Sequence, residues 1–172
     1  LFNVTEVDPF SRRWNPKARE KKIDQLGGSE ETELAVVRAL EWFKRNQEKD
    51  GSWRMRSHDS AATGLVMLAY MGYGAKHIKQ GEFEGYQEQL DRAVNWMLSI
   101  ERNGDMRGRG NMYDHGIAAI AMAEAYYMTK DPNLRPVVQR IVDFTLHAQN
   151  PSTGGWRYKP YMEKKYSRDI DH

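Results

Sequence analysis

Aspartate and histidine stand side by side at three widely separated places in the chain. The three pairs are His58-Asp59, Asp114-His115 and Asp171-His172. Imidazole and carboxylate groups are common ligands of divalent metal ions such as zinc. The same two groups also serve as general acids and bases. The pairs therefore predict a metal site or an acid–base site, provided that the fold brings them together.

A simpler interpretation is that each aspartate caps a helix. Aspartate is favoured at a helix start, where it accepts hydrogen bonds from free backbone amides and meets the positive end of the helix dipole. Capping would account for Asp59 and Asp114, but it gives no reason for the histidine beside each of them. We favour capping and keep the functional cluster as the alternative, in which zinc would be the cofactor.

A single carboxylate, Glu124, interrupts a stretch that is otherwise free of charge. Without a partner, a buried carboxylate has a raised pKa, which suits a general acid. The structural alternative, which we favour, is pairing with Arg107 or Arg109. Methionine and tyrosine side chains in the uncharged stretches could line a pocket for an apolar substrate, although at helical spacing such residues more often form plain core. They are Met67, Tyr70, Met71, Met122, Tyr126 and Tyr127.

From residue 29 onward, the elements that would position these side chains are helices. The hydrophobic periodicity predicts helices over residues 29–46, 60–71, 86–101, 116–128 and 135–149. The second and fourth are almost free of charge, as is typical of helices buried on all sides, whereas the other three have one apolar face. This alternation predicts two layers of helices, with the uncharged helices inside.

One sequence pattern recurs in the three helices that have a single apolar face. An arginine is followed four residues later by an aromatic residue and, five residues further on, by glutamine or glutamate. The three copies are Arg38, Trp42 and Gln47; Arg92, Trp96 and Glu101; and Arg140, Phe144 and Gln149. A turn containing glycine follows each copy. The pattern predicts a repeated helix hairpin.

The first copy, with its turn and Trp53, resembles the QW motif of squalene–hopene cyclases and related terpene cyclases. The third copy, which ends in Trp156, keeps the same residue types, whereas the second lacks the glutamine and the final tryptophan. The resemblance covers residues 33–172. It implies an all-α fold of the α/α-toroid type, shared with prenyltransferases, whose inner helices line a central cavity. It also implies that Gln47, Gln149 and the tryptophans hold successive outer helices together.

The resemblance also implies a candidate catalytic residue. Squalene–hopene cyclases protonate an alkene with the middle aspartate of a D-x-D-D motif at the start of an inner helix. The sequence Asp169-Ile-Asp171-His172 occupies a comparable place, so Asp171 would be the proton donor, with Asp59 and Asp114 at the corresponding helix starts. The final histidine departs from that motif. Protein prenyltransferases use an Asp/Cys/His zinc site, and a chain without cysteine does not supply it.

Composition limits the remaining classes. The chain has 172 residues, a formal charge of +2, 29% charged residues and no cysteine. These values fit a globular protein and exclude disulfide scaffolds, cysteine-ligated zinc and thiol catalysis. The near-neutral balance gives no reason to expect nucleic acid as a partner. Residues 1–28 are predicted to form an extended arm or linker, and residues 29–172 to form the repeat domain.

The repeat domain is expected to be incomplete, because a closed toroid of this type takes about twice as many helices. An open half-ring exposes inner apolar surface, at a cost of about 25 cal/mol per Å². We therefore expect the remainder of a longer chain, which we favour, or a second half-ring as partner. The expected function is a non-catalytic squalene cyclase-like domain that binds an apolar, isoprenoid ligand. The alternatives are a cyclase-type enzyme with an aspartate acid and a metal-dependent enzyme.

Overall fold

The computed structural model describes residues 21, 23, 25–79 and 85–161. Within these residues the chain is all-helical, with an isolated bridge between Arg102 and Asp105 and no strand. The helices are α2 (Glu30–Arg45), α3 (Asp59–Gly72), α4 (Gln87–Ile100), α5 (Met112–Thr129) and α6 (Arg135–Ala148). The all-α prediction is confirmed. The expected arm lies almost wholly outside the described residues, as do Asp171 and His172.

Two helix starts are fixed by reciprocal side-chain and backbone hydrogen bonds. At the start of α2, the amide of Ser29 donates to Thr32 Oγ1 over 2.9 Å, and the amide of Thr32 donates to Ser29 Oγ. At the start of α5, the amide of Asn111 donates to Asp114 Oδ2, and the amide of Tyr113 donates to Asn111 Oδ1. These capping boxes satisfy amides that have no partner within the helix. The second one starts α5 a full turn earlier than the sequence predicted.

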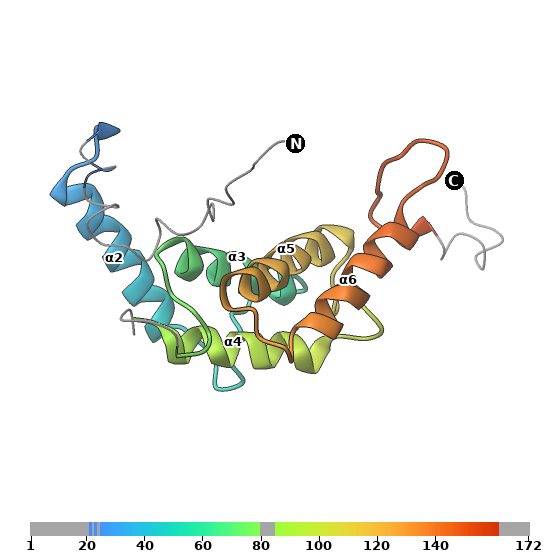
Figure 1. Ribbon diagram of the computed structural model, residues 1–172, viewed down its shortest axis with the longest axis horizontal. Helices are drawn as coiled ribbons and strands as arrows, with labels where there is room; N and C mark the ends of the chain where they lie inside the picture. Colours follow the sequence, from blue (N-terminus) through green and yellow to red (C-terminus); the bar gives the residue numbers. More distant parts are fainter. Residues whose placement is uncertain (1–20, 22, 24, 80–84, 162–172) are drawn as a thin grey trace, which may run out of the picture.

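The uncharged helices α3 and α5 form the centre of the molecule. Figure 1 shows them side by side, with α4 running along one side and with α2 and α6 at opposite ends. Both central helices bury side chains on several faces, whereas Leu40 is the buried residue of α2 and Ile141 and Ala148 are those of α6. The predicted division into central and peripheral helices is therefore confirmed for the described residues.

The two central helices run parallel and are joined at both ends. Where they begin, His58 Nδ1 lies 2.9 Å from Asp114 Oδ2. Just beyond their last turns, His77 Nε2 lies 3.1 Å from Asp131 Oδ2. Between these bridges the helices approach closely at Gly64, where an added Cβ would lie 3.1 Å from Cγ2 of Ile117. The start of each central helix is thus held in a fixed place relative to the other.

The core between the layers consists mainly of methionine, alanine and aromatic side chains. Tyr70 is fully buried, and its ring centroid lies 4.9 Å from that of Tyr86 and 6.0 Å from that of Trp53. Its hydroxyl donates to the carbonyl of Leu40, which ties α3 to α2. No helix in the described part of the chain is long and apolar enough to cross a membrane.

Candidate functional site

The Asp/His pairs at the starts of α3 and α5 come together in an unexpected combination. His58 contacts Asp114, the aspartate of the other pair, and Asp114 is almost fully buried. Asp59 instead accepts hydrogen bonds from the amide of Met55 and from the side chains of two arginines, Arg54 and Arg109, all within 3.0 Å. The two members of the His58-Asp59 pair therefore have different partners, and the contact between a histidine and an aspartate joins α3 to α5.

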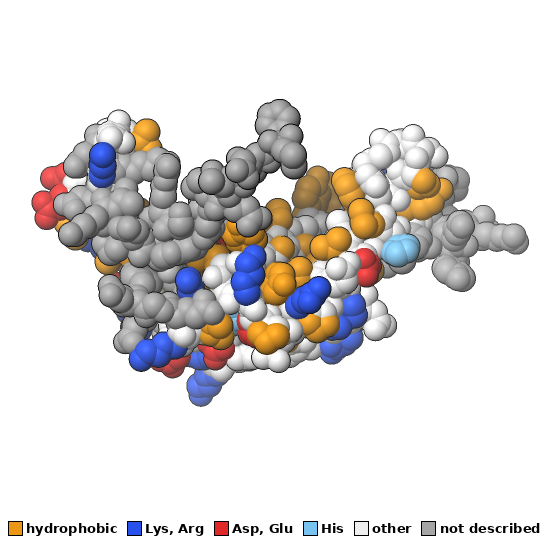
Figure 2. Space-filling view, in the orientation of Figure 1, with side chains coloured by type: hydrophobic (Ala, Val, Ile, Leu, Met, Phe, Trp, Pro, Cys, Tyr) orange, Lys and Arg blue, Asp and Glu red, His pale blue; other side chains and the backbone are white. Residues whose placement is uncertain are grey.

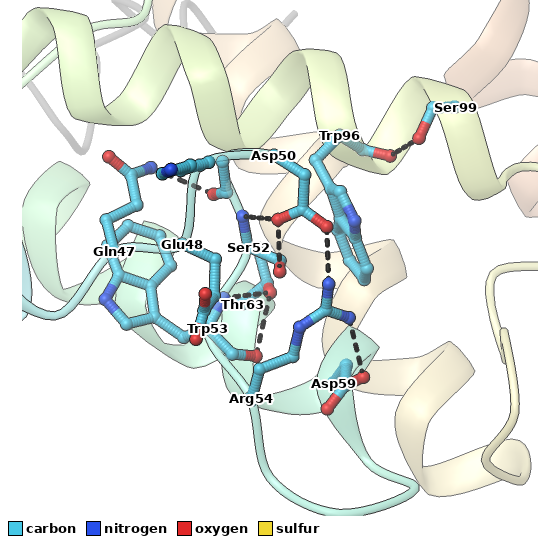
Figure 3. Close-up of polar contacts among 12 residues, drawn as sticks. Gln47, Glu48, Asp50, Ser52, Trp53, Arg54, Asp59, Thr63, Trp96 and Ser99 are labelled. Carbon is cyan, nitrogen blue, oxygen red and sulfur yellow. Dashed lines mark hydrogen bonds and ion pairs between the residues drawn. The ribbon is translucent and has the colours of Figure 1, made fainter.

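Asp59 is surrounded by positive charge. Burial alone would raise the pKa of its carboxyl group, but the amide of Met55 and the two guanidinium groups of Arg54 and Arg109 lower this pKa below its usual range. Figure 3 shows Arg54 between Asp50 and Asp59, with one nitrogen directed at each carboxylate. Asp59 is therefore ionised at neutral pH. An ionised carboxylate does not donate a proton, so this geometry does not support Asp59 as a general acid.

His115 points into the core, away from the helix starts. The amide of Met106 donates to its Nδ1 over 3.2 Å, and its Nε2 lies 2.8 Å from Thr145 Oγ1. The Thr145 hydroxyl donates to the carbonyl of Ile141, so it accepts the Nε2 proton. Burial lowers the pKa of His115 below its usual value. Both ring nitrogens thus form hydrogen bonds, and the ring links the turn after α4 to α6.

Of the residues predicted to bind a metal ion, His58 and Asp114 are the two whose side chains contact each other in the described structure. Among these residues, no group of three histidine or acidic side chains is placed to hold a metal ion. Asp171 and His172 fall outside the described part of the chain, so the prediction that includes them stays a prediction. The capping interpretation fits Asp114, which accepts a hydrogen bond from the amide of Asn111 at the start of α5. Asp59 accepts its backbone hydrogen bond from Met55, in the loop before α3.

Glu124 lies half-buried in the middle of α5. Each arginine that the sequence offered as its partner binds another carboxylate. Arg107 binds Asp105 through Nε and Nη2, and Arg109 binds Asp59. In the described structure Arg107 thus binds within its own loop and Arg109 binds the start of α3, and the pairing of Glu124 with one of them stays a prediction.

The side chains expected to contact a substrate are mostly core residues. Met67, Tyr70 and Met122 are fully buried, and Tyr126 is half-buried against the same cluster. A ligand on the surface of the protein does not reach the three buried side chains without a rearrangement of the core. In this structure the three side chains fill the space between helices, and the prediction that they contact a substrate stays a prediction.

Exposed apolar side chains do occur on the two central helices, and all of them except Tyr127 are at positions that the sequence analysis did not single out. The exposed fraction is 67% for Tyr113, 60% for Ile120 and 52% for Leu65, and Tyr127 is also exposed. We call these four residues the apolar stripe. Figure 2 shows hydrophobic side chains gathered over α3 and α5. The seven-residue spacing of Tyr113, Ile120 and Tyr127, which places them on one helix face, was the available signal.

A cleft of about 350 Å³ lies at the start of α5, where the apolar stripe begins. It is lined by Met112, Tyr113, Trp156, Arg157 and Tyr158. The rings of Tyr113 and Tyr158 meet edge to face, with centroids 5.4 Å apart. Its volume falls within the range of small-molecule sites, and such sites combine apolar walls with a few polar groups. Here the polar group is the guanidinium of Arg157.

The turns of the sequence repeat are held by the residues of the pattern. Gln47 Nε2 donates to the carbonyls of Gly51 and of Gln89 in α4, and Trp53 Nε1 donates to the carbonyl of Phe43. In the third copy, Gln149 donates to Gly154, and Trp156 Nε1 donates to Thr145. The glutamines and the two turn tryptophans thus have structural roles, and Gln47 connects α2 directly to α4.

These features define an all-α protein in which a helix-and-turn unit recurs around two buried parallel helices. No known family model matches the chain, no curated protein matches it, and no solved structure matches it. The assignment of a function therefore depends on the helices, turns and exposed surfaces of the chain itself.

Proposed function

We propose that the chain is a partial α/α toroid of the squalene cyclase-like type, and that it binds an apolar, isoprenoid-class molecule along its central helices without catalysing a reaction. The observation that carries the proposal is the apolar stripe. Helices that are otherwise buried expose Leu65, Tyr113 and Ile120. Hydrophobic side chains gathered on one face of a protein, as Figure 2 shows over α3 and α5, are typical of a binding site.

The helix arrangement is consistent with the toroid part of the proposal. Central and peripheral helices alternate along the chain, and consecutive peripheral helices are connected by the contacts of Gln47 with Gln89 and of Glu101 with Arg140. In such an arrangement, the face of the central helices that is not covered by α4 borders the interior of the ring. The apolar stripe and the adjoining cleft would then line that interior.

Asp59, at the start of α3, favours binding over acid catalysis. Burial raises the pKa of its carboxyl group, but the amide of Met55 and the guanidinium groups of Arg54 and Arg109 outweigh this and lower the pKa below its usual value. A cyclase-type acid needs a carboxyl group that holds its proton, and hydrogen bonds to the ionised form oppose this. The enzyme alternative would therefore depend on the other candidate acids, Asp114, Glu124 and Asp171, of which Asp171 lies outside the described residues.

Farnesol, a short isoprenoid alcohol, is the probe that tests the proposal. Its binding is measured by tryptophan fluorescence and calorimetry, since Trp156 borders the cleft. We expect saturable binding that is weakened about tenfold or more by Ile120→Glu, because burial of an aliphatic side chain contributes about 1.5–3 kcal/mol. The matched control is Val36→Glu, which places the same charge at an exposed apolar position of α2. Equal affinities for the two variants, or no saturable binding, would overturn the proposal.

A further inference from the structure

Two turns of the chain hold the next peripheral helix in the same way. Gly51, with φ at +94°, follows α2, and Gly104, with φ at +88°, follows α4. A Cβ on Gly51 would overlap the carbonyl oxygen of Arg92 in α4, and a Cβ on Gly104 would overlap the carbonyl oxygen of Arg140 in α6. Each position therefore needs glycine for two reasons: the backbone is left-handed, and the following helix approaches too closely for a Cβ atom.

The two arginines also bind the turn with their side chains. Arg92 Nη2 donates to the carbonyl of Glu48 over 2.7 Å and to that of Lys49 over 3.2 Å. Arg140 forms a two-pronged contact with the carboxylate of Glu101, at 2.9 and 3.1 Å. The contact therefore has two halves. One is a turn with a glycine, and the other is a helix face that carries an arginine.

The third turn, after α6, has the first half of this contact, and no helix in the described part of the chain supplies the second half. Gly154 has φ at +70°, and its carbonyl accepts a hydrogen bond from Gln149 as that of Gly51 does from Gln47. No described atom lies within 4 Å of a Cβ added to Gly154. Trp156, two residues after Gly154, is 48% exposed. The corresponding residues of the other two turns, Trp53 and Met106, are 5% and 0% exposed.

The helix α2 has the second half of the contact, and no turn among the described residues supplies the first half. Arg38 and Trp42 occupy the same repeat positions as Arg92 and Trp96. Trp42 is 54% exposed, and Arg38 is exposed and donates no hydrogen bond to any described residue. Within the described residues, the turn after α6 thus has no helix against it, and α2 carries an arginine at the repeat position that contacts such a turn in α4 and α6.

We propose that two copies of this chain associate head to tail, with α2 of each copy docked on the third turn of the other. In this dimer the backbone of Arg38 takes the open space at Gly154, and its guanidinium donates to the carbonyls of Asn150 and Pro151, which correspond to Glu48 and Lys49. Trp42 and Trp156 become covered. The occupant is a second copy because this chain itself carries the matching helix face, with the same arginine in the same register.

Two variants disable the two halves of the contact separately. Arg38→Glu reverses the charge that the turn carbonyls would accept, and it leaves the third turn intact. Gly154→Asn fills the space at the turn, and asparagine tolerates a left-handed backbone, so the turn keeps its shape. The matched controls are Lys44→Glu, another charge reversal on α2, and Gly108→Asn, at a glycine with φ at +57° where an added Cβ would make only an ordinary contact, 3.9 Å from Ile100 Cδ1. Circular dichroism checks that all four variants fold.

Sedimentation velocity then measures association over a wide range of concentrations. We expect the wild type and both controls to form a species of twice the 20.0 kDa chain mass, and each disabling variant alone to remain monomeric. A mixture of the two disabling variants should associate again, since the intact turn of one fits the intact α2 of the other. A wild type that stays monomeric would overturn the proposal, and would assign the turn to a different partner. Dimerisation of Gly154→Asn alone, or a mixture that stays monomeric, would also overturn it.

Discussion

The Nδ1 atom of His115 accepts a hydrogen bond from the backbone amide of Met106 over 3.2 Å, inside the core. This contact fixes the tautomer, because an acceptor nitrogen carries no proton and Nε2 must then donate to Thr145. The ring thereby joins the turn after α4 to the middle of α6. A proton added to Nδ1 would face the amide proton of Met106 and break this connection.

The folded state is therefore expected to lose stability as the pH falls from 7 to about 5. Burial lowers the pKa of His115, so the unfolded chain, with a histidine pKa of about 6.5, binds more protons in this range than the folded chain. Each unit by which the pKa is depressed is worth about 1.4 kcal/mol. Urea unfolding at several pH values measures the slope. His115→Gln should flatten it, and an unchanged slope in this variant would refute the assignment.

Alanine substitutions at two glycines are expected to differ strongly in their effect. At Gly51 the new Cβ would overlap the carbonyl of Arg92, whereas at Gly154 no described atom is near. Both positions have positive φ, which alone costs about 1–2 kcal/mol. We expect Gly154→Ala to cost about that amount and Gly51→Ala about 3–5 kcal/mol.

Denaturant unfolding in an Arg38→Glu background measures these two values without a contribution from association. The difference between the two variants reports the helix contact at Gly51, since the backbone penalty is common to both. Equal losses of stability would contradict the equivalence of the turns and the vacancy at Gly154.

Zinc is expected to leave the melting temperature unchanged. His58 and Asp114 supply two ligands, and the neighbouring His115 already uses both ring nitrogens for hydrogen bonds. Stable structural zinc sites have four ligands. Thermal unfolding with and without added zinc tests this, with His147→Ala as the control for an exposed histidine. A zinc-dependent rise that His58→Ala abolishes and His147→Ala preserves would restore the metal hypothesis.

The helices could be predicted from the sequence because their signals are local. Ser29 with Thr32 marks the start of α2, and the absence of charge marks the central helices. The start of α5 was missed because Asn111 and Asp114 cap it together, with the aspartate inside the first turn.

The geometry of the candidate site was less accessible from the sequence. Adjacent residues on a helix point about 100° apart, so His58 and Asp59 could not both face Asp114. Their actual partners come from another helix and from loops, which periodicity does not place. The same limit applies to Met67 and Ile120. Both are apolar and helical, and only the packing of α3 against α5 decides which is buried and which is exposed.

The most direct test of the proposed function is photolabelling with a diazirine derivative of farnesol, followed by peptide mapping with mass spectrometry. The account predicts labels on the apolar stripe, in peptides that contain Leu65, Tyr113 or Ile120, and predicts that excess unlabelled farnesol removes them. Labels confined to α2 and the outer side of α4, or labels that unlabelled farnesol does not remove, would contradict the claim that the central helices bind an apolar ligand.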